Sequence, residues 1–237
     1  MRNPKTTGVG MSAVRRTAIL VGVLFLVQTA SYLAGDVLVR SAVETGTAVS
    51  DSSAAGVRAG VFLQFVNVAA VIGIGVLMFP ILKRFSEGIA LGYTATKIME
   101  AALLLVSALF ALLILPIGQT ATAGVETLGA LSLEGYDLAF QLAMIALGAG
   151  SLLFMYGLYK FRLVPRALSV LGAVGYAGLF VSGWTSIAGW EMAAVLYVPG
   201  ALFELALPIW LIVKGFHEPT TDSHPEIRYR FPETVQV

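Results

Sequence analysis

The sequence predicts an all-α, polytopic membrane bundle of six transmembrane helices with both the N- and the C-terminus in the cytoplasm. Three observations predict this fold. The 237 residues are 57% hydrophobic and only 12% charged, whereas soluble domains carry roughly 25% charged residues. Six segments reach the length of about 20 apolar residues that a helix needs to cross the hydrocarbon of a bilayer. Lys and Arg gather on alternate connections, as the positive-inside rule requires.

The predicted spans follow one another closely along the chain. They are Thr17–Val39, Arg58–Ile81, Ile89–Ile117, Asp137–Tyr159, Ala167–Ile187 and Glu191–Val213. Tight basic turns are expected at 81–88 and at 160–166, where Pro165 suits the start of a helix. The stretches 40–57 and 118–136 are rich in Ser, Thr, Gly and acidic residues, so we expect exposed loops there.

One membrane domain, 17–214, is expected between a cytoplasmic N-terminal tail, 1–16, and a flexible cytoplasmic C-terminal tail, 215–237. Arg15 and Arg16 precede the first span as they would in a signal peptide. The apolar run is longer than a usual signal, however, and no clear Ala-x-Ala cleavage site follows it. We therefore interpret it as an uncleaved anchor; cleavage would leave five helices and an outside N-terminus.

The orientation follows from the basic residues. With the N-terminus inside, twelve of the fifteen Lys and Arg fall in cytoplasmic segments, Arg40 and Arg58 fall outside, and Lys97 lies within a span. Only an even number of spans gives this distribution, which predicts a multi-pass protein of the cell (plasma or inner) membrane. A net charge of +1 offers no field that would recruit nucleic acid.

Aromatic and charged side chains mark the predicted outer boundary of the membrane. Trp184, Trp190 and Tyr136 fall there, where aromatic rings favour the membrane interface. We also expect Asp36 to pair with Arg58, because one connection joins their helices.

Polar residues inside the spans define a candidate site. Lys97 and Glu100 are three residues apart and therefore share one helix face. Glu204, in the sixth span, is expected at a similar depth near the midplane. Two carboxylates that share one lysine are not both comfortably charged, so one glutamate can carry a proton. The predicted intramembrane polar cluster consists of Lys97, Glu100, Glu204, Asn67, Gln28 and Gln64.

Two interpretations of this cluster stay open. It is either the midplane site of a small carrier, or a set of ion pairs and amide hydrogen bonds that only hold helices together in a non-catalytic structural or sensory subunit. In the second case Lys97 could also extend to the cytoplasmic interface.

An enzyme is not expected, because intramembrane chemistry usually needs histidines, metal ligands or an activated nucleophile. No span contains a histidine and the chain has no cysteine. His217 and His224 are too far apart in sequence for a helical metal pair. We expect no catalytic residue, no cofactor and no metal site.

Four stretches of the chain resemble one bacterial and archaeal family. Arg16–Phe25, Ala90–Ala101, Leu158–Gly172 with its Pro165-Arg166 turn, and Phe203–Gly215 are similar to the DUF4386 family. The resemblance covers about residues 14 to 216. It implies a small multi-pass membrane protein of unknown function and brings no catalytic residues. The expected partners are the lipid bilayer and either another membrane protein or further copies of this chain.

Overall fold

The computed structural model describes residues 13–44, 51–118, 125–190 and 193–217. These residues form six helices and no strand, and every helix is long and apolar enough to cross a membrane. The predicted all-α bundle with six spans is therefore confirmed. The helices are α1 (Ala13–Glu44), α2 (Asp51–Lys83), α3 (Glu87–Gly118), α4 (Val125–Lys160), α5 (Arg166–Ile187) and α6 (Ala193–Val213).

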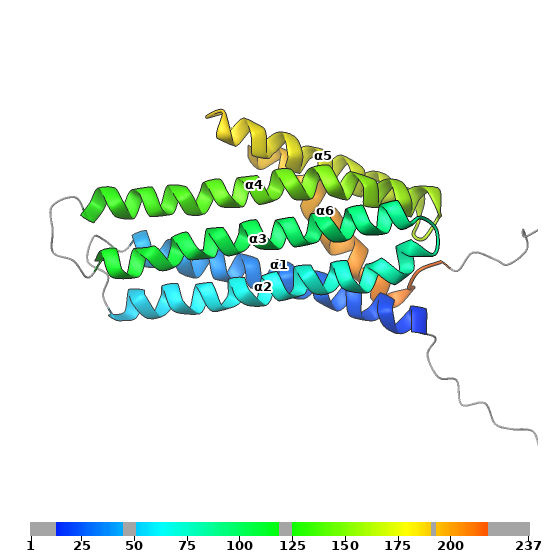
Figure 1. Cartoon of the computed structure of the whole chain (residues 1–237), viewed down its shortest axis with the longest axis horizontal. Coiled ribbons are helices and arrows are strands. Elements are labelled where there is room, and N and C mark those ends of the chain that lie inside the picture. Colours follow the sequence, from blue (N-terminus) through cyan, green and yellow to red (C-terminus); the bar gives the residue numbers. More distant parts are fainter. Residues whose placement is uncertain (1–12, 45–50, 119–124, 191–192, 218–237) are drawn as a thin grey trace, which may run out of the picture.

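The six helices form a closed ring. Each packs against its neighbours in sequence, and α6 packs against α1. Figure 1 shows α2, α3 and α4 side by side along the long axis, with α5 inclined to them. We call the end that holds the start of α1 and the end of α6 the termini end, and the opposite end of α1 to α4 the loop end. Because each helix packs against two others, most side chains that point into the ring are shielded from lipid and can be polar.

Four helices are longer than the sequence predicts. α1 ends at Glu44 instead of Val39, α2 begins at Asp51 instead of Arg58, and α4 begins at Val125. The expected loops 40–57 and 118–136 are thus largely helical, and that prediction is wrong. Helices of 32–36 residues extend about 48–54 Å, beyond a hydrocarbon core of about 30 Å. Hydropathy marks only the part inside the hydrocarbon.

The helix extensions have a core of their own. At the loop end α1 to α4 bury a small apolar cluster separate from the main one. Its members are Val39, Ala42, Val57, Val61, Ala108, Ala111 and Tyr136. Packing against neighbouring helices therefore keeps these less apolar segments helical.

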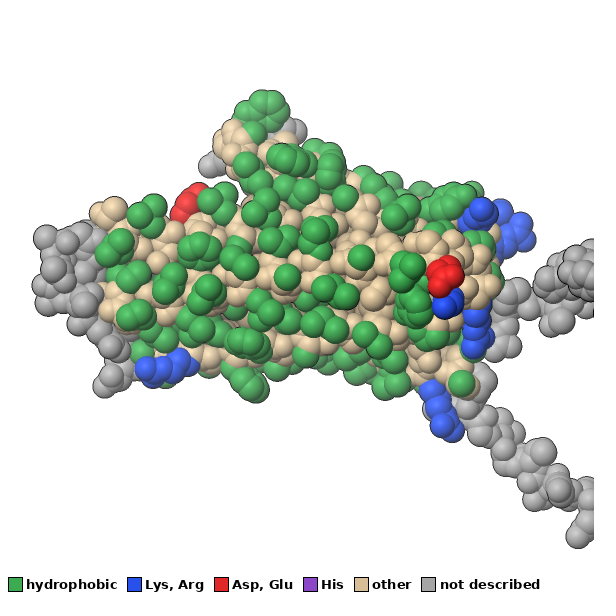
Figure 2. All heavy atoms as spheres, viewed as in Figure 1, with side chains coloured by type: hydrophobic (Ala, Val, Ile, Leu, Met, Phe, Trp, Pro, Cys, Tyr) green, Lys and Arg blue, Asp and Glu red, His purple; other side chains and the backbone are tan. Residues whose placement is uncertain are grey.

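The outer surface is apolar along most of its length. Large hydrophobic side chains such as Val195, Phe62 and Val37 are more than 60% exposed. Figure 2 shows hydrophobic side chains over most of one face, while Lys and Arg side chains lie mainly at the termini end. A water-soluble protein rarely exposes so large an apolar area. Together with six apolar helices, this surface identifies a multi-pass membrane protein.

The bundle changes from four helices to six along its axis. Near the loop end α1 contacts α4 directly, as the Tyr32 and Phe140 rings stack with centroids 4.9 Å apart. Toward the termini end α1 contacts α6 instead. Gly22 permits this approach, because a Cβ at that position would lie 2.9 Å from the carbonyl oxygen of Pro208. The shorter α5 and α6 thus fill the space between α4 and α1 only in one part of the molecule.

Candidate functional site

A cavity of about 380 Å³ lies where the four-helix part meets the six-helix part. All six helices contribute to its wall. Its polar lining includes Gln28, Asn67, Glu100 and Glu204. Ligand pockets for small molecules occupy roughly 300–1,000 Å³, so the cavity has room for a small organic solute.

Lys97 and Glu100 form a buried ion pair within α3. The Lys97 Nζ lies 2.9 Å from Glu100 Oε2, and the two side chains are 1% and 4% exposed. The ammonium also lies 5.8 Å and 5.9 Å from the ring centroids of Phe25 and Tyr93. Lys97 therefore does not extend to the membrane interface. The pair is compact because residues three apart share a helix face.

Glu204 of α6 faces the same cavity but has no cation of its own. None of the ion pairs among the described residues includes it. Its one hydrogen bond within this part of the chain comes from the Thr29 hydroxyl at 3.4 Å, and that hydroxyl also donates to the Phe25 carbonyl at 3.0 Å. A hydroxyl has one proton, and O–H···O bonds usually measure about 2.7–2.8 Å. The contact to Glu204 is the weaker of the two.

The structure brings together most of the cluster that the sequence predicts. Gln28, Asn67, Glu100 and Glu204 line the cavity, and Lys97 lies beside it through its bond to Glu100. α3 and α6 are not neighbours in the ring, so the two glutamates meet only across the cavity.

Gln64 is not part of this group. Its amide donates to the Tyr136 hydroxyl at 3.1 Å. It lies about one turn from Asn67 on α2, and that turn carries it toward the loop end, away from the cavity.

Several residues of the site escaped the sequence analysis. Tyr32, Phe140 and Tyr197 place three aromatic rings on the cavity wall. An aromatic residue inside an apolar span has no sequence signal of its own. The sequence predicted Gln28 as a residue of the site, but it did not predict the burial of its side chain or the lack of a partner for its amide oxygen in the described part of the chain. The side chain is 5% exposed, and Oε1 is buried without a hydrogen-bond partner among the described residues.

A search for related proteins gives one family. Residues 20–215 match the family described as a domain of unknown function (DUF4386). The chain belongs to the DUF4386 family. The resemblance seen in the sequence is thereby confirmed, and the matched region contains Lys97, Glu100 and Glu204. Comparisons with curated proteins and with solved structures found no match.

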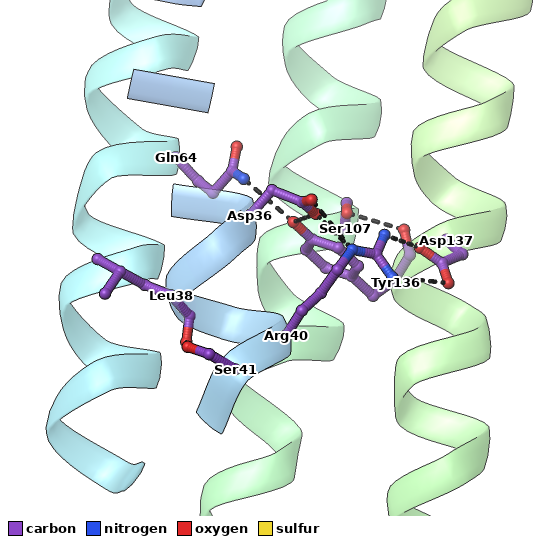
Figure 3. A network of polar contacts seen from close by, with 8 residues as sticks. All are labelled: Asp36, Leu38, Arg40, Ser41, Gln64, Ser107, Tyr136 and Asp137. Atoms are coloured by element: carbon purple, nitrogen blue, oxygen red, sulfur yellow. Dashed lines mark hydrogen bonds and ion pairs between the residues drawn. The ribbon is translucent and has the colours of Figure 1, made fainter. Parts of the chain in front are cut away.

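A second polar cluster of this DUF4386 protein lies nearer the loop end (Figure 3). Arg40 Nε donates to Asp36 at 3.0 Å, and its Nη2 donates to Asp137 of α4 at 2.5 Å. The Tyr136 hydroxyl donates to Asp36 Oδ1 at 2.9 Å. Ser107 of α3 donates to the Tyr136 carbonyl at 2.8 Å. With Gln64, this loop-end network joins α1, α2, α3 and α4.

The loop-end network corrects two predictions. Asp36 pairs with Arg40, one turn along its own helix, while Arg58 is exposed. The Asp36–Arg58 prediction is wrong because α1 turns Asp36 toward α4. Tyr136 is 1% exposed, so it is an interior ring and not an interface ring. Tyr136 lies on the helical extension of α4 that precedes Asp137 and packs against residues of α1, α2 and α3.

No metal centre is visible in the part of the chain that the structure describes, where no group of three or more His, Asp or Glu side chains could hold an ion. His217 packs its ring edge-on against Trp210, at 5.8 Å between centroids. His224, the other histidine, lies outside the described residues.

Proposed function

We propose that this protein is a small carrier that binds its solute in the mid-bundle cavity and uses Glu204 as an exchangeable charge. One observation carries the proposal: a carboxylate without a cationic partner faces a cavity whose wall includes residues of all six helices. A cluster that served only to hold helices together would have no need of such a space. In this proposal the protein is not an enzyme.

The charges around the cavity supply the mechanism. Lys97 neutralises Glu100 at 2.9 Å, which leaves the negative charge of Glu204 in excess. An isolated charge away from water is costly and is neutralised by a proton or by a cation. If a proton and a cationic solute bind Glu204 in turn, binding of one releases the other. This exchange of one positive charge for another couples the movement of the solute to that of the proton.

The proposal includes a place and an orientation: the cell membrane, with the termini end toward the cytoplasm. Support comes from the distribution of charge in the structure. The turns and helix ends at the termini end carry Lys83, Arg84, Lys160, Arg166 and Lys214. Basic residues are in excess on the cytoplasmic side of membrane proteins. Lipid is then the main partner of the apolar outer surface.

Proteoliposomes that enclose a pH-sensitive dye test the carrier. A panel of membrane-impermeant solutes would contain a quaternary amine, a sulfonate and a sugar alcohol. We expect one of these classes to move protons across vesicles with the wild-type protein and not across protein-free vesicles. We expect Glu204→Gln to abolish this response, since the amide cannot take up a proton in exchange.

Glu87→Gln is the matched control. Glu87 is 63% exposed at the termini end, where it pairs with Lys83, and its replacement should leave the proton response unchanged. A response that Glu204→Gln does not reduce would overturn the proposal. No response to any solute would overturn it too, and would favour the structural or sensory subunit.

A further inference from the structure

The cavity has an opening on its side, between α1 and α6. At the termini end these helices are in close contact, as Arg15 donates to the carbonyls of Leu211 and Ile212 at 2.9 Å and 2.6 Å. Their last hydrogen bond among the described residues is that of Thr29 with Glu204. Beyond Thr29, α1 contacts α4 through the stacked Tyr32 and Phe140 rings.

Beyond Thr29, α6 leaves α1, although the hydroxyl of its Tyr197 still donates to Gln141 of α4 at 3.2 Å. α6 stays on α5, where a Cβ at Gly175 would lie 2.6 Å from the Cα of Gly200. The two helices therefore separate at the level of the cavity. Three residues line the cavity and are exposed at this separation: Leu33 of α1, 58% exposed, Leu205 of α6, 50% exposed, and Ala201. They form the rim of a lateral opening.

The depth of this opening places it in hydrocarbon. Thr29 lies 16 residues after the start of α1 and 15 before its end, which is about 22–24 Å from either helix end. The hydrocarbon core extends about 15 Å to each side of its midplane. The rim side chains are also apolar. The opening thus faces lipid tails, and a solute that uses it must first dissolve in the bilayer.

The chemistry of the cavity selects the charge of that solute. Glu204 supplies a carboxylate without a cation, and Gln28 supplies a buried amide oxygen without a donor among the described residues. Both are acceptors and suit a positive group. The rings of Tyr32, Phe140 and Tyr197 line the same space, and aromatic faces attract organic cations. An anionic solute would meet the carboxylate of Glu204, whose charge no lysine among the described residues neutralises.

We infer that the cavity binds a membrane-dissolved organic cation with an apolar body, which reaches Glu204 sideways from the bilayer between α1 and α6. The inference rests on the proposed function in that it takes the cavity as the solute site. To the cationic solute of that mechanism it adds an apolar body and a route through the bilayer.

Binding to the protein in lipid nanodiscs tests the class. Three probes share a phenylbutyl body and differ in the head group: a trimethylammonium, a sulfonate and an alcohol. We expect the cation to bind at least tenfold more tightly than the other two, and Glu204→Gln to weaken it at least tenfold. Glu87→Gln should bind it as the wild type does. Equal binding of the sulfonate, or cation binding that does not depend on Glu204, would overturn the inference.

Two measurements test the route. The chain has no cysteine, so a spin label on Leu205→Cys or Leu33→Cys is unique. We expect relaxation by dissolved oxygen, which concentrates in hydrocarbon, to exceed relaxation by a water-soluble nickel chelate. Ala201→Trp should slow association of the cationic probe at least tenfold by filling the opening. Ile209→Trp is the control, since Ile209 is 57% exposed on the same helix and does not line the cavity.

The outcomes separate the inference from the carrier proposal. A label that relaxes faster with the nickel chelate, or unchanged association in Ala201→Trp, overturns the lateral route. Glu204-dependent cation binding without proton movement in vesicles overturns the carrier and supports the binding site. Proton-coupled movement of the sulfonate or the sugar alcohol supports the carrier and overturns the cationic class. If Ala201→Trp does not fold, the spin labels still decide the route.

Discussion

The loop-end network, with Asp36, Arg40 and Asp137, and the cavity residues Lys97, Glu100 and Glu204 carry the same charges. The two sets differ in how these charges are paired. Each has two carboxylates and one base. At the loop end Arg40 bonds both Asp36 and Asp137. At the cavity Lys97 bonds Glu100 alone. A guanidinium presents five donors in a planar fork, whereas an ammonium is a compact point charge. Arg40 therefore pairs with both carboxylates of its network. Lys97 pairs with only one carboxylate, so Glu204 faces the cavity without a cation from the described part of the chain.

The two clusters also differ in how deeply their ion pairs are buried, and burial decides how much each pair affects stability. The Arg40, Asp36 and Asp137 side chains are 38%, 21% and 39% exposed, and partly exposed ion pairs contribute little to stability. The Lys97–Glu100 pair is almost fully buried. Removing one partner of such a pair leaves an uncompensated charge in a medium of low dielectric constant. The two clusters should thus respond differently to the same kind of substitution.

The largest effect is expected for Glu100→Gln. This substitution leaves the Lys97 ammonium buried without a counter-charge, and we expect it to lower the free energy of unfolding by about 3–5 kcal/mol. Glu204→Gln is the matched substitution across the cavity. It breaks no ion pair, so we expect no comparable loss. Unfolding in detergent, followed by circular dichroism, compares the two. An equal loss in both variants would show that Glu204 shares Lys97 with Glu100.

An intermediate effect is expected at the loop end for Tyr136→Phe. The substitution removes the hydroxyl that donates to Asp36 and accepts from Gln64. Leaving buried polar groups unsatisfied costs about 1–3 kcal/mol. Binding of the cationic probe should not change, because Tyr136 does not line the cavity.

Tyr156→Phe provides the control for this loop-end prediction. Tyr156 is 54% exposed, so loss of its hydroxyl should have little effect on unfolding. A loss of probe binding in Tyr136→Phe, with unfolding unchanged, would mean that the loop-end network belongs to the binding site and not to the scaffold.

Some of this contrast could be predicted from the sequence. Hydropathy located the six spans, and the three-residue spacing of Lys97 and Glu100 predicted their pair. The contact of Arg40 with Asp137 could not be predicted, since it depends on α1 packing against α4 at one end only. Hydropathy also missed the helical extension that carries Tyr136, because the extension continues beyond the hydrocarbon.

The cavity itself has no sequence signal. It exists because α5 and α6, at 22 and 21 residues, are shorter than the other four helices, and because α6 parts from α1 halfway along it. The sequence does not predict this difference in length, because the predicted span Glu191–Val213 is as long as Thr17–Val39. It also does not show where the helices sit in the ring. The depth estimate placed Glu204 near Glu100, and only the packing shows that a space separates them.

The smallest effect is expected for Gln28→Leu, and its sign is the informative part. Gln28 Oε1 is buried without a partner among the described residues, so leucine removes an unsatisfied acceptor at similar volume. We expect a gain of about 1 kcal/mol in the free energy of unfolding. Binding of the cationic probe should weaken by less than in Glu204→Gln, because an amide dipole attracts a cation less than a carboxylate does.

Gln64→Leu is the same substitution in the loop-end network. Gln64 is also buried, but its amide donates to Tyr136, so we expect a loss of about 1 kcal/mol where Gln28→Leu gains. Opposite signs of the two changes in unfolding free energy would show that Gln64 stabilises the fold. Gln28, in contrast, would lower stability and serve a ligand. If both variants are destabilised equally, Gln28 has a partner of its own, and the acceptor attributed to the cation site is already occupied.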